Sequence, residues 1–428
     1  MTTNIEPIRD FGLYTAIGVL ITYILAFSLL PSSLVFLPKP KVVENQQIRK
    51  QWRNTLGRTF LWMLNNKKVI IFISVCLVML SFIGMRHLKV NTFLIDDLPL
   101  SHPMKSDFLF FDKHFGGSRP FEAAIIIADS TYDVFDYPVL KDLEKVEEHL
   151  MSSFGTSTLS SPLSIIRFTN QAVNGGLSKY YQLPNESEME GLQRPLDQLL
   201  KQPAFSNLTT DGNLVSRFSG RMPDIGSAQS TYKNRQLLNF TESSIDTSLV
   251  KIRVTGTSLL IDKNNSYLVD NMATGLAIAF AAVAFIAGLM FRSWRMVLIT
   301  LIPNVIPLLL VAGIMGAMGI SLKLTTSVIF TVAFGIAVDD TIHFVSKLKL
   351  ELAKGRSTLY AIKRVYFSTG KAIIITTLVL ISGFATLLLS SFGGTFYIGL
   401  FVGLTLLFAL VVDLTLLPVL ILLFYRKE

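Results

Sequence analysis

Charged residues are scarce in this sequence: they supply 16% of its 428 residues, where a soluble domain carries about a quarter. Hydrophobic residues make up 50%, and the mean hydropathy is +0.50. The apolar residues are gathered in blocks long enough to cross a hydrocarbon core, which takes roughly 20 helical residues. The composition excludes an ordinary soluble protein and predicts an integral membrane protein.

Cysteine is almost absent, because Cys76 is the single one and it lies in an apolar stretch. The large polar region of the chain therefore has no disulfides, which favours a bacterial inner membrane as its location. Four of the five histidines are scattered through that polar region without metal-ligand spacing. The sequence also has no nucleophile elbow and no phosphate-binding loop. It predicts neither an enzyme nor a bound cofactor.

Seven apolar segments are predicted to cross the membrane. They lie at about 11–37, 68–86, 267–291, 296–319, 324–346, 371–391 and 396–425. The net charge of +9 is concentrated in the short segments that flank these spans, as the positive-inside rule requires of cytoplasmic loops. Placing the basic segments inside puts the N-terminus outside and residues 87–266 in the periplasm. The basic charge does not need nucleic acid as an explanation.

The chain therefore divides into five predicted parts. They are a first span (1–37), a cytoplasmic amphipathic linker (38–67), a second span (68–86), a periplasmic domain (87–266) and a five-span bundle (267–428). The linker carries apolar residues at helical spacing between arginines: Ile48, Trp52, Leu56, Phe60 and Leu64. This pattern fits a helix lying on the cytoplasmic leaflet and, equally, an ordinary basic linker helix.

The periplasmic domain mixes strand-like and helix-like runs. Strands are predicted over 121–129, 214–222 and 250–255, and helices over 141–154, 162–173 and 188–200. The predicted fold class is an α-helical polytopic membrane protein of about seven transmembrane helices with one α+β periplasmic domain.

The first and last spans resemble each other. FGLYTAIGVLITYILAFSLLP begins at Phe11 and IGLFVGLTLLFALVVDLTLLP begins at Ile398, so Gly12 aligns with Gly399 and both spans end in Leu-Leu-Pro. Repeated halves are how many transporter folds are built. Residues 1–37 are therefore predicted to be the last span of a first repeat, with a complete second repeat after them.

The span 324–346 holds two adjacent carboxylates, Asp339 and Asp340, together with His343. A charge at mid-bilayer costs ~2.5–3.5 kcal/mol on insertion scales, and neighbouring carboxylates also repel each other. At least one of them is therefore expected to bind a proton, which suits coupling to a proton gradient. Gly335 shares a helical face with Asp339 and His343 and is expected to admit a close neighbouring helix. Headgroup water near the cytoplasmic end is the alternative environment for these groups.

Polar residues on neighbouring spans are candidates to support these carboxylates. Asn304 lies between Pro303 and Pro307 and is expected to satisfy carbonyls that the prolines free. The supporting candidates on the last two spans are Thr376, Thr377 and Asp413. Bonding of each threonine to its own helix, and a purely structural Asp413 near the boundary, are the alternatives.

These motifs resemble one superfamily of exporters. GIAVDDTIHF at 335–344 looks like the proton-relay motif of resistance–nodulation–division (RND) exporters, close to their MmpL-like branch. PNVIP at 303–307, TTLVLISGFATLLLSSF at 376–392 and PIRDFGL at 7–13 resemble other spans of that superfamily. Its members carry twelve spans and two outward domains. The resemblance therefore implies the C-terminal half of such a protein, with its other half on a missing segment, a separate chain or a second copy.

The resemblance implies half of an exporter, driven by the proton-motive force, of hydrophobic or amphiphilic molecules such as lipids. Its partners would be the membrane, a lipid-like substrate and the missing half or a second copy, with protons as the coupling ion and no other cofactor. A non-transporting, sterol-sensing-like lipid-binding protein and an assistant of protein export similar to SecDF are the alternatives. The carboxylates favour transport, because a lipid sensor has no need of them.

Overall fold

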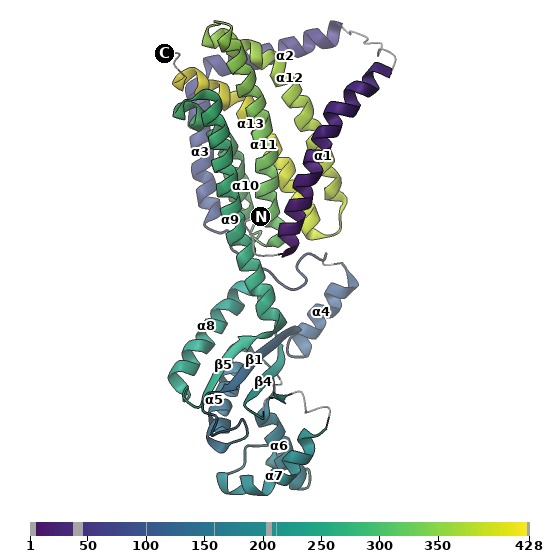
Figure 1. Cartoon of the computed structure of the whole chain (residues 1–428), viewed down its shortest axis with the longest axis vertical. Helices are drawn as coiled ribbons and strands as arrows, with labels where there is room; N and C mark the ends of the chain where they lie inside the picture. The colour runs from purple at the N-terminus through teal and green to yellow at the C-terminus, as the bar shows by residue number, and fades with distance from the viewer. Residues whose placement is uncertain are drawn as a thin grey trace. The chain divides into compact units, whose positions relative to one another are not determined.

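The computed structural model describes residues 6–36, 46–99, 101–157, 159–202, 208–210 and 212–425. The chain divides into two compact units (Figure 1). Residues 1–89, 268–390 and 394–428 form the first, called here the membrane unit. Residues 90–267 with 391–393 form the second, called here the sheet domain.

Seven helices in the described part of the chain are long and apolar enough to cross a membrane. They are α1 (Glu6–Phe36), α3 (Lys67–Met85), α9 (Gly256–Phe291), α10 (Trp294–Ala317), α11 (Leu324–Ala353), α12 (Thr358–Ala385, continued by a 3₁₀ turn, Thr386–Leu389) and α13 (Gly393–Phe424). Each coincides with one predicted span, which confirms the predicted fold class. The helices α9, α11 and α12 extend well beyond the apolar windows, because helical hydrogen bonding continues into polar sequence that hydropathy does not count.

The helices α3 and α10 pack with their backbones in contact. A Cβ added to Gly84 of α3 would lie 2.2 Å from the carbonyl oxygen of Gly313 on α10, and one added to Gly316 would lie 2.2 Å from the oxygen of Gly84. Small residues allow this approach, which in a membrane supplies the van der Waals contact that holds helices together.

The predicted amphipathic linker forms α2 (Gln46–Asn65). Leu56, Phe60 and Met63 on its apolar side are buried. The Phe60 ring lies 5.2 Å from that of Tyr366 on α12, and the Tyr366 hydroxyl forms a 3.1 Å hydrogen bond with the Thr59 hydroxyl. The apolar face of α2 around Phe60 therefore packs against α12.

An antiparallel sheet forms the centre of the sheet domain. Its strands are β1 (Arg119–Ile127), β2 (Leu159–Ser160), β3 (Thr209–Thr210), β4 (Val215–Met222) and β5 (Val250–Thr255), in the order β2-β4-β1-β5, with β3 pairing β4. The register places Ala123 opposite Phe218 and Ile125 opposite Ile252. Every second residue of β1 is buried, so one face of the sheet carries the core.

Helices of the sheet domain cover that face. They are α5 (Tyr137–Phe154), α6 (Pro162–Val173), α7 (Glu186–Leu200) and α8 (Gly226–Ser244). The domain also contains α4 (Pro103–His114) and a 3₁₀ turn at Ser178–Tyr180. Side chains from α5, α6, α7 and α8 join the core of the sheet. The three predicted strands and three predicted helices are present, with starts or ends moved by up to four residues. The helices α4 and α8 were not predicted, because α4 buries no residue and the sequence of α8 is mostly polar.

The contact between α3 and α10 predicts that the same glycine-to-alanine substitution has different effects on stability at two positions. Gly84→Ala should lower the unfolding temperature in detergent, because its methyl group would meet the Gly313 backbone and overpacking costs about 1–3 kcal/mol. Gly403→Ala on α13 is the matched control, because nothing described lies within 4 Å of its added Cβ. It should leave stability unchanged or raise it, since alanine is the better helix former. Equal effects of the two changes would contradict the close packing.

Candidate functional site

The helix α11 has one packed face and one exposed face. Phe334, Ala337 and Thr341 recur at helical spacing and are buried, while Gly335 and Asp339 are exposed. Adjacent residues of a helix differ by about 100° in direction. The two neighbouring aspartates are therefore directed to different sides of the helix, and the structure separates them.

Asp340 lies on the side of α11 that faces α12. The Thr377 hydroxyl lies 3.0 Å from Asp340 Oδ2 and 2.7 Å from the Ile373 carbonyl oxygen of its own helix. Thr377 is 1% exposed. A hydroxyl that can donate to either acceptor allows the carboxyl group to change its protonation state without leaving the threonine unpaired.

Asp413 of α13 lies in a second polar contact of the same bundle. The Thr341 hydroxyl donates to Asp413 Oδ1 over 2.8 Å, and the Asn304 side-chain amide donates to the Thr341 oxygen over 3.1 Å. These three residues are at most 2% exposed. They join α10, α11 and α13. A buried polar group that lacks a partner costs about 1–3 kcal/mol, so these contacts fix which faces of the three helices meet.

Asn304 does not act as the sequence predicted. Its amide donates to the Thr300 carbonyl oxygen over 2.8 Å, in addition to Thr341. The carbonyls freed by Pro303 and Pro307 lie at other positions, because a proline removes the hydrogen bond to the residue four before it. The role of Asn304 is to connect α10 with α11.

Thr376 does not reach a carboxylate either. Its hydroxyl donates to carbonyl oxygens of its own helix, those of Ala372 and Ile373, at 3.0 Å each. Its side chain is exposed, because it lies about 100° around α12 from Thr377. The intrahelical alternative therefore describes Thr376, and the contact with Asp340 belongs to Thr377 alone.

Gly335, Asp339 and His343 form a stripe on the exposed face of α11. Asp339 Oδ1 and His343 Nε2 are 3.4 Å apart, and their side chains are 71% and 67% exposed. No described atom lies within 4 Å of a Cβ added to Gly335. The predicted close approach of a helix at Gly335 is therefore not made within the described part of this chain.

Thr341 is the member of the site that the sequence did not predict. It lies directly after Asp340 and continues the buried spacing of α11. That spacing was a usable signal, but a threonine in an apolar helix ordinarily bonds to its own backbone. Only the arrangement of three helices shows that it bridges Asn304 and Asp413.

Two carboxyl groups with hydroxyl donors can take up and release protons. Asp413 Oδ2 is buried and has no hydrogen-bond partner among the described residues, which leaves one oxygen ready for a proton or a changed contact. In the part of the chain that the structure describes, no three His, Cys, Asp or Glu side chains are grouped so as to hold a metal ion. The chemistry that the cluster supports is proton binding.

An apolar groove of about 930 Å³ lies beside the cluster in the membrane unit. It is lined by α3, α10 and α13, with Trp62 and His87 among its residues. Val412 and Thr415 of α13 line the groove, and they flank Asp413. The groove and the carboxylate cluster are therefore built on the same helix.

Comparisons with known proteins agree with this description. The MMPL family matches residues 209–428. A membrane protein of Methanocaldococcus jannaschii is 24% identical over 365 residues, which cover 83% of this chain and 91% of that protein. The hopanoid transporter HpnN of Burkholderia multivorans is 30% identical over 40% of this chain and 20% of its own length. The trehalose monomycolate exporter MmpL3 of Mycolicibacterium smegmatis is 26% identical over 26% of this chain and 11% of its own length.

The two neighbouring threonines of α12 allow a matched test of the cluster. Thr377→Val should destabilise the protein by about 1–3 kcal/mol, because it leaves the Asp340 carboxyl without its donor. Thr376→Val removes a hydroxyl that bonds only its own helix and should change stability little. Thermal unfolding of both variants in detergent measures the difference. Equal unfolding temperatures would show that Asp340 does not depend on Thr377.

Proposed function

Because the chain belongs to the MMPL family, we propose that it is half of an exporter, driven by proton influx, of a hydrophobic or amphiphilic molecule such as a lipid. The observation that carries this proposal is the pair of carboxyl groups in the membrane unit, Asp340 bonded to Thr377 and Asp413 bonded to Thr341. Ionisable residues in a membrane span are costly and mark ion pathways or proton relays.

Proton exchange at this cluster has a defined structural consequence. A neutral carboxyl group can donate a hydrogen bond, whereas an ionised one only accepts. Thr341 links Asp413 to Asn304, so a change at Asp413 alters a contact between three helices. Loading from one side of the membrane and release to the other would then shift α10, α11 and α13 against one another.

The kind of cargo is supported by the relatives and by the groove. One relative is named for hopanoid transport and another for the export of trehalose monomycolate, both amphiphilic lipids, although the matches cover 20% and 11% of those proteins. The groove of about 930 Å³ is lined mainly by apolar side chains and lies within the apolar part of the bundle. Such a space suits an acyl or isoprenoid chain. The lipid-binding alternative, without transport, would use the groove but not the carboxylates.

The relay is tested by removing its protonation sites. Asp340→Asn and Asp413→Asn should each abolish gradient-driven movement of a fluorescent phospholipid by the assembled transporter in proteoliposomes, because each change removes a proton site of the cluster and keeps the volume. His343→Ala should impair transport less, since water can replace the imidazole. Thr376→Val is the control, because Thr376 lies outside the cluster. Undiminished transport by the Asp339→Asn/Asp340→Asn double variant would refute proton coupling through α11.

We also propose that α11 pairs with a second half through its exposed stripe. Gly335, Asp339 and His343 have no helix against them in the described chain, and Thr331 and Lys347 extend the same exposed line. An aspartate facing lipid costs ~2.5–3.5 kcal/mol on insertion scales. A second copy of this chain or a separate first half would remove that cost by covering the stripe.

Pairing predicts a specific crosslink. In a Cys76→Ser background, Gly335→Cys should form an intermolecular disulfide or bifunctional crosslink in native membranes, because the stripe is the contact surface. Gly275→Cys on α9 is the matched control, since it also has open space around it but lies on another helix. A monomer in mild detergent with no crosslink at residue 335, yet with gradient-driven transport, would show that a single half is sufficient.

A further inference from the structure

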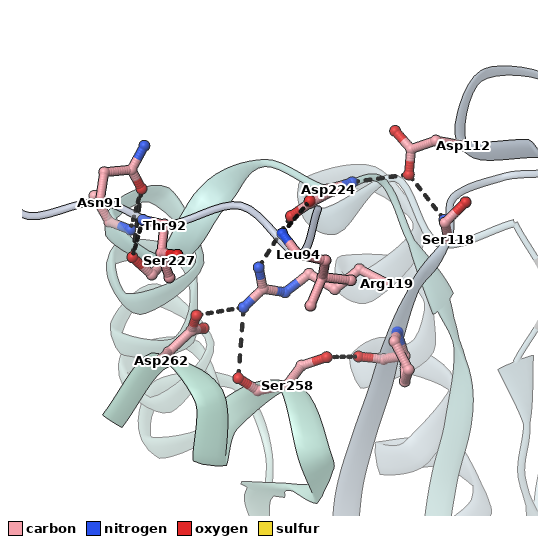
Figure 2. Close-up of polar contacts among 12 residues, drawn as sticks. Asn91, Thr92, Leu94, Asp112, Ser118, Arg119, Asp224, Ser227, Ser258 and Asp262 are labelled. Atoms are coloured by element: carbon pink, nitrogen blue, oxygen red, sulfur yellow. Dashed lines mark hydrogen bonds and ion pairs between the residues drawn. The ribbon is translucent and has the colours of Figure 1, made fainter. Parts of the chain in front are cut away.

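A buried arginine lies in the sheet domain. Arg119, the first residue of β1, is 0% exposed. Its guanidinium forms an ion pair with Asp262 and a second one with Asp224, whose Oδ1 lies 3.1 Å from Nη1 (Figure 2). Removing such charges from water costs several kcal/mol per ion, so a buried ion pair is weak evidence for stability, and in some proteins it serves to fix the position of its partners.

The partners of Arg119 come from segments far apart in the sequence. Asp224 lies between β4 and α8, and its Oδ2 accepts a hydrogen bond from the backbone nitrogen of Leu94 over 2.8 Å. Asp262 and the Ser258 carbonyl oxygen lie in the first two turns of α9, the latter 3.5 Å from Nη2. Figure 2 shows these groups converging on the guanidinium. Arg119 therefore holds the segment after α3 and the beginning of α9 to the sheet.

Those two segments are two of the chain's crossings between its two units; the others lie on either side of residues 391–393. The first leaves α3 and is fixed in the sheet domain by hydrogen bonds between Thr92 and Ser227, 2.9 Å in each direction. The second is α9 itself, which begins in the sheet domain and continues into the membrane unit.

Within the membrane unit, one crossing contacts the segment that leads into α11 and the other contacts α11 itself, the helix that carries Asp340. The backbone nitrogen of Leu322, two residues before α11, donates to the Lys89 carbonyl oxygen over 2.8 Å. On α9, the Phe280 ring lies 4.2 Å from the Phe334 ring of α11. A displacement of α11 therefore acts on both crossings, and both lead to Arg119.

Building on the proposed function, we propose that Arg119 with Asp224 and Asp262 is a positioning cluster that transmits the protonation state of the relay helix to the sheet domain. The cluster has room for a second arrangement: Arg119 Nε and Asp262 Oδ2 are buried and have no hydrogen-bond partner among the described residues. A bidentate contact, in which two nitrogens of Arg119 donate to the two carboxylate oxygens of Asp262, would use both atoms. Coupling of this kind requires an element with two discrete arrangements that both sites bias.

The test compares the full-length protein in nanodiscs with and without Asp340→Asn, by hydrogen–deuterium exchange of peptides covering 91–97 and 256–262. Asparagine imitates the neutral carboxyl group, so with the native cluster it should change exchange in both segments about threefold or more, the size of coupling found along such networks. The charge-free variant Arg119→Met/Asp224→Asn/Asp262→Leu should remove that response. Replacing a buried ion cluster by apolar groups is often neutral for stability, so the variant should still fold.

A matched control separates transmission from stability. Arg167 of α6 pairs with Glu147 and Glu144 of α5, at 2.6 and 3.2 Å, inside the sheet domain and away from both crossings. Arg167→Met/Glu147→Leu should keep the full response to Asp340→Asn.

Two results would overturn the proposal: no response with the native cluster, or an undiminished response in the charge-free variant. If the charge-free variant fails to fold, Arg119→Lys answers the same question, because lysine keeps the positive charge but cannot donate two parallel hydrogen bonds to one carboxylate. It should reduce the response, and a full response would contradict the role of Arg119. The exchange experiment needs neither substrate nor gradient, so its outcome is independent of whether transport itself is observed.

Discussion

The membrane unit depends on one constraint: inside a bilayer there is no water to satisfy a polar group, so every buried polar atom must find its partner in protein. Asp340 and Asp413 meet part of that constraint through single threonine hydroxyls, Thr377 and Thr341, although Asp413 Oδ2 has no partner among the described residues. Asn304 extends the second contact to a third helix. The faces on which α10 to α13 meet are otherwise mainly apolar, and apolar packing alone is compatible with more than one rotation of a helix about its axis. The polar contacts select one of these rotations, because any other would leave a carboxyl group unpaired.

The same constraint connects the cluster to its surroundings. α13 presents Asp413 to the cluster and the flanking Val412 and Thr415 to the apolar groove, so a rotation of this helix would alter the groove and the cluster together. The groove is bounded on its other side by α3 and α10, which are held backbone to backbone through Gly84 and Gly313. A closely packed pair of helices therefore faces the helix that carries Asp413. In the proposed function, a change of charge at Asp413 would therefore alter the shape of that apolar space.

Much of the fold was predictable because its signals are local. Hydropathy found all seven spans, and the cost of a charge in lipid singled out Asp339 and Asp340, with Asp413 as a supporting candidate only. The sequence could not show that Asp339 and Asp340 separate, because periodicity gives the angle between two residues but not which direction faces protein. It also could not distinguish Thr377 from Thr376, since both threonines bond their own helix and only the position of α11 gives one of them a second partner. The contacts of Arg119 could not be predicted for another reason: its partners lie 105 and 143 residues away in the sequence.

On the exposed stripe of α11, the polar side chains have no neighbouring helix within the described chain. Asp339 and His343 lie 3.4 Å apart on successive turns, and their contact offsets part of the free-energy cost of placing polar groups against lipid. A closed pair about a two-fold axis sets the same surface against itself, so a stripe with one sign of charge would repel its own copy. This stripe contains an acceptor and a donor one helical turn apart, with a glycine one turn before them that leaves room for a neighbouring backbone. In the proposed pairing, each carboxylate would therefore lie beside the imidazole of the facing stripe. The contact between Asp339 and His343 within one chain would be the same contact that two facing stripes make between them.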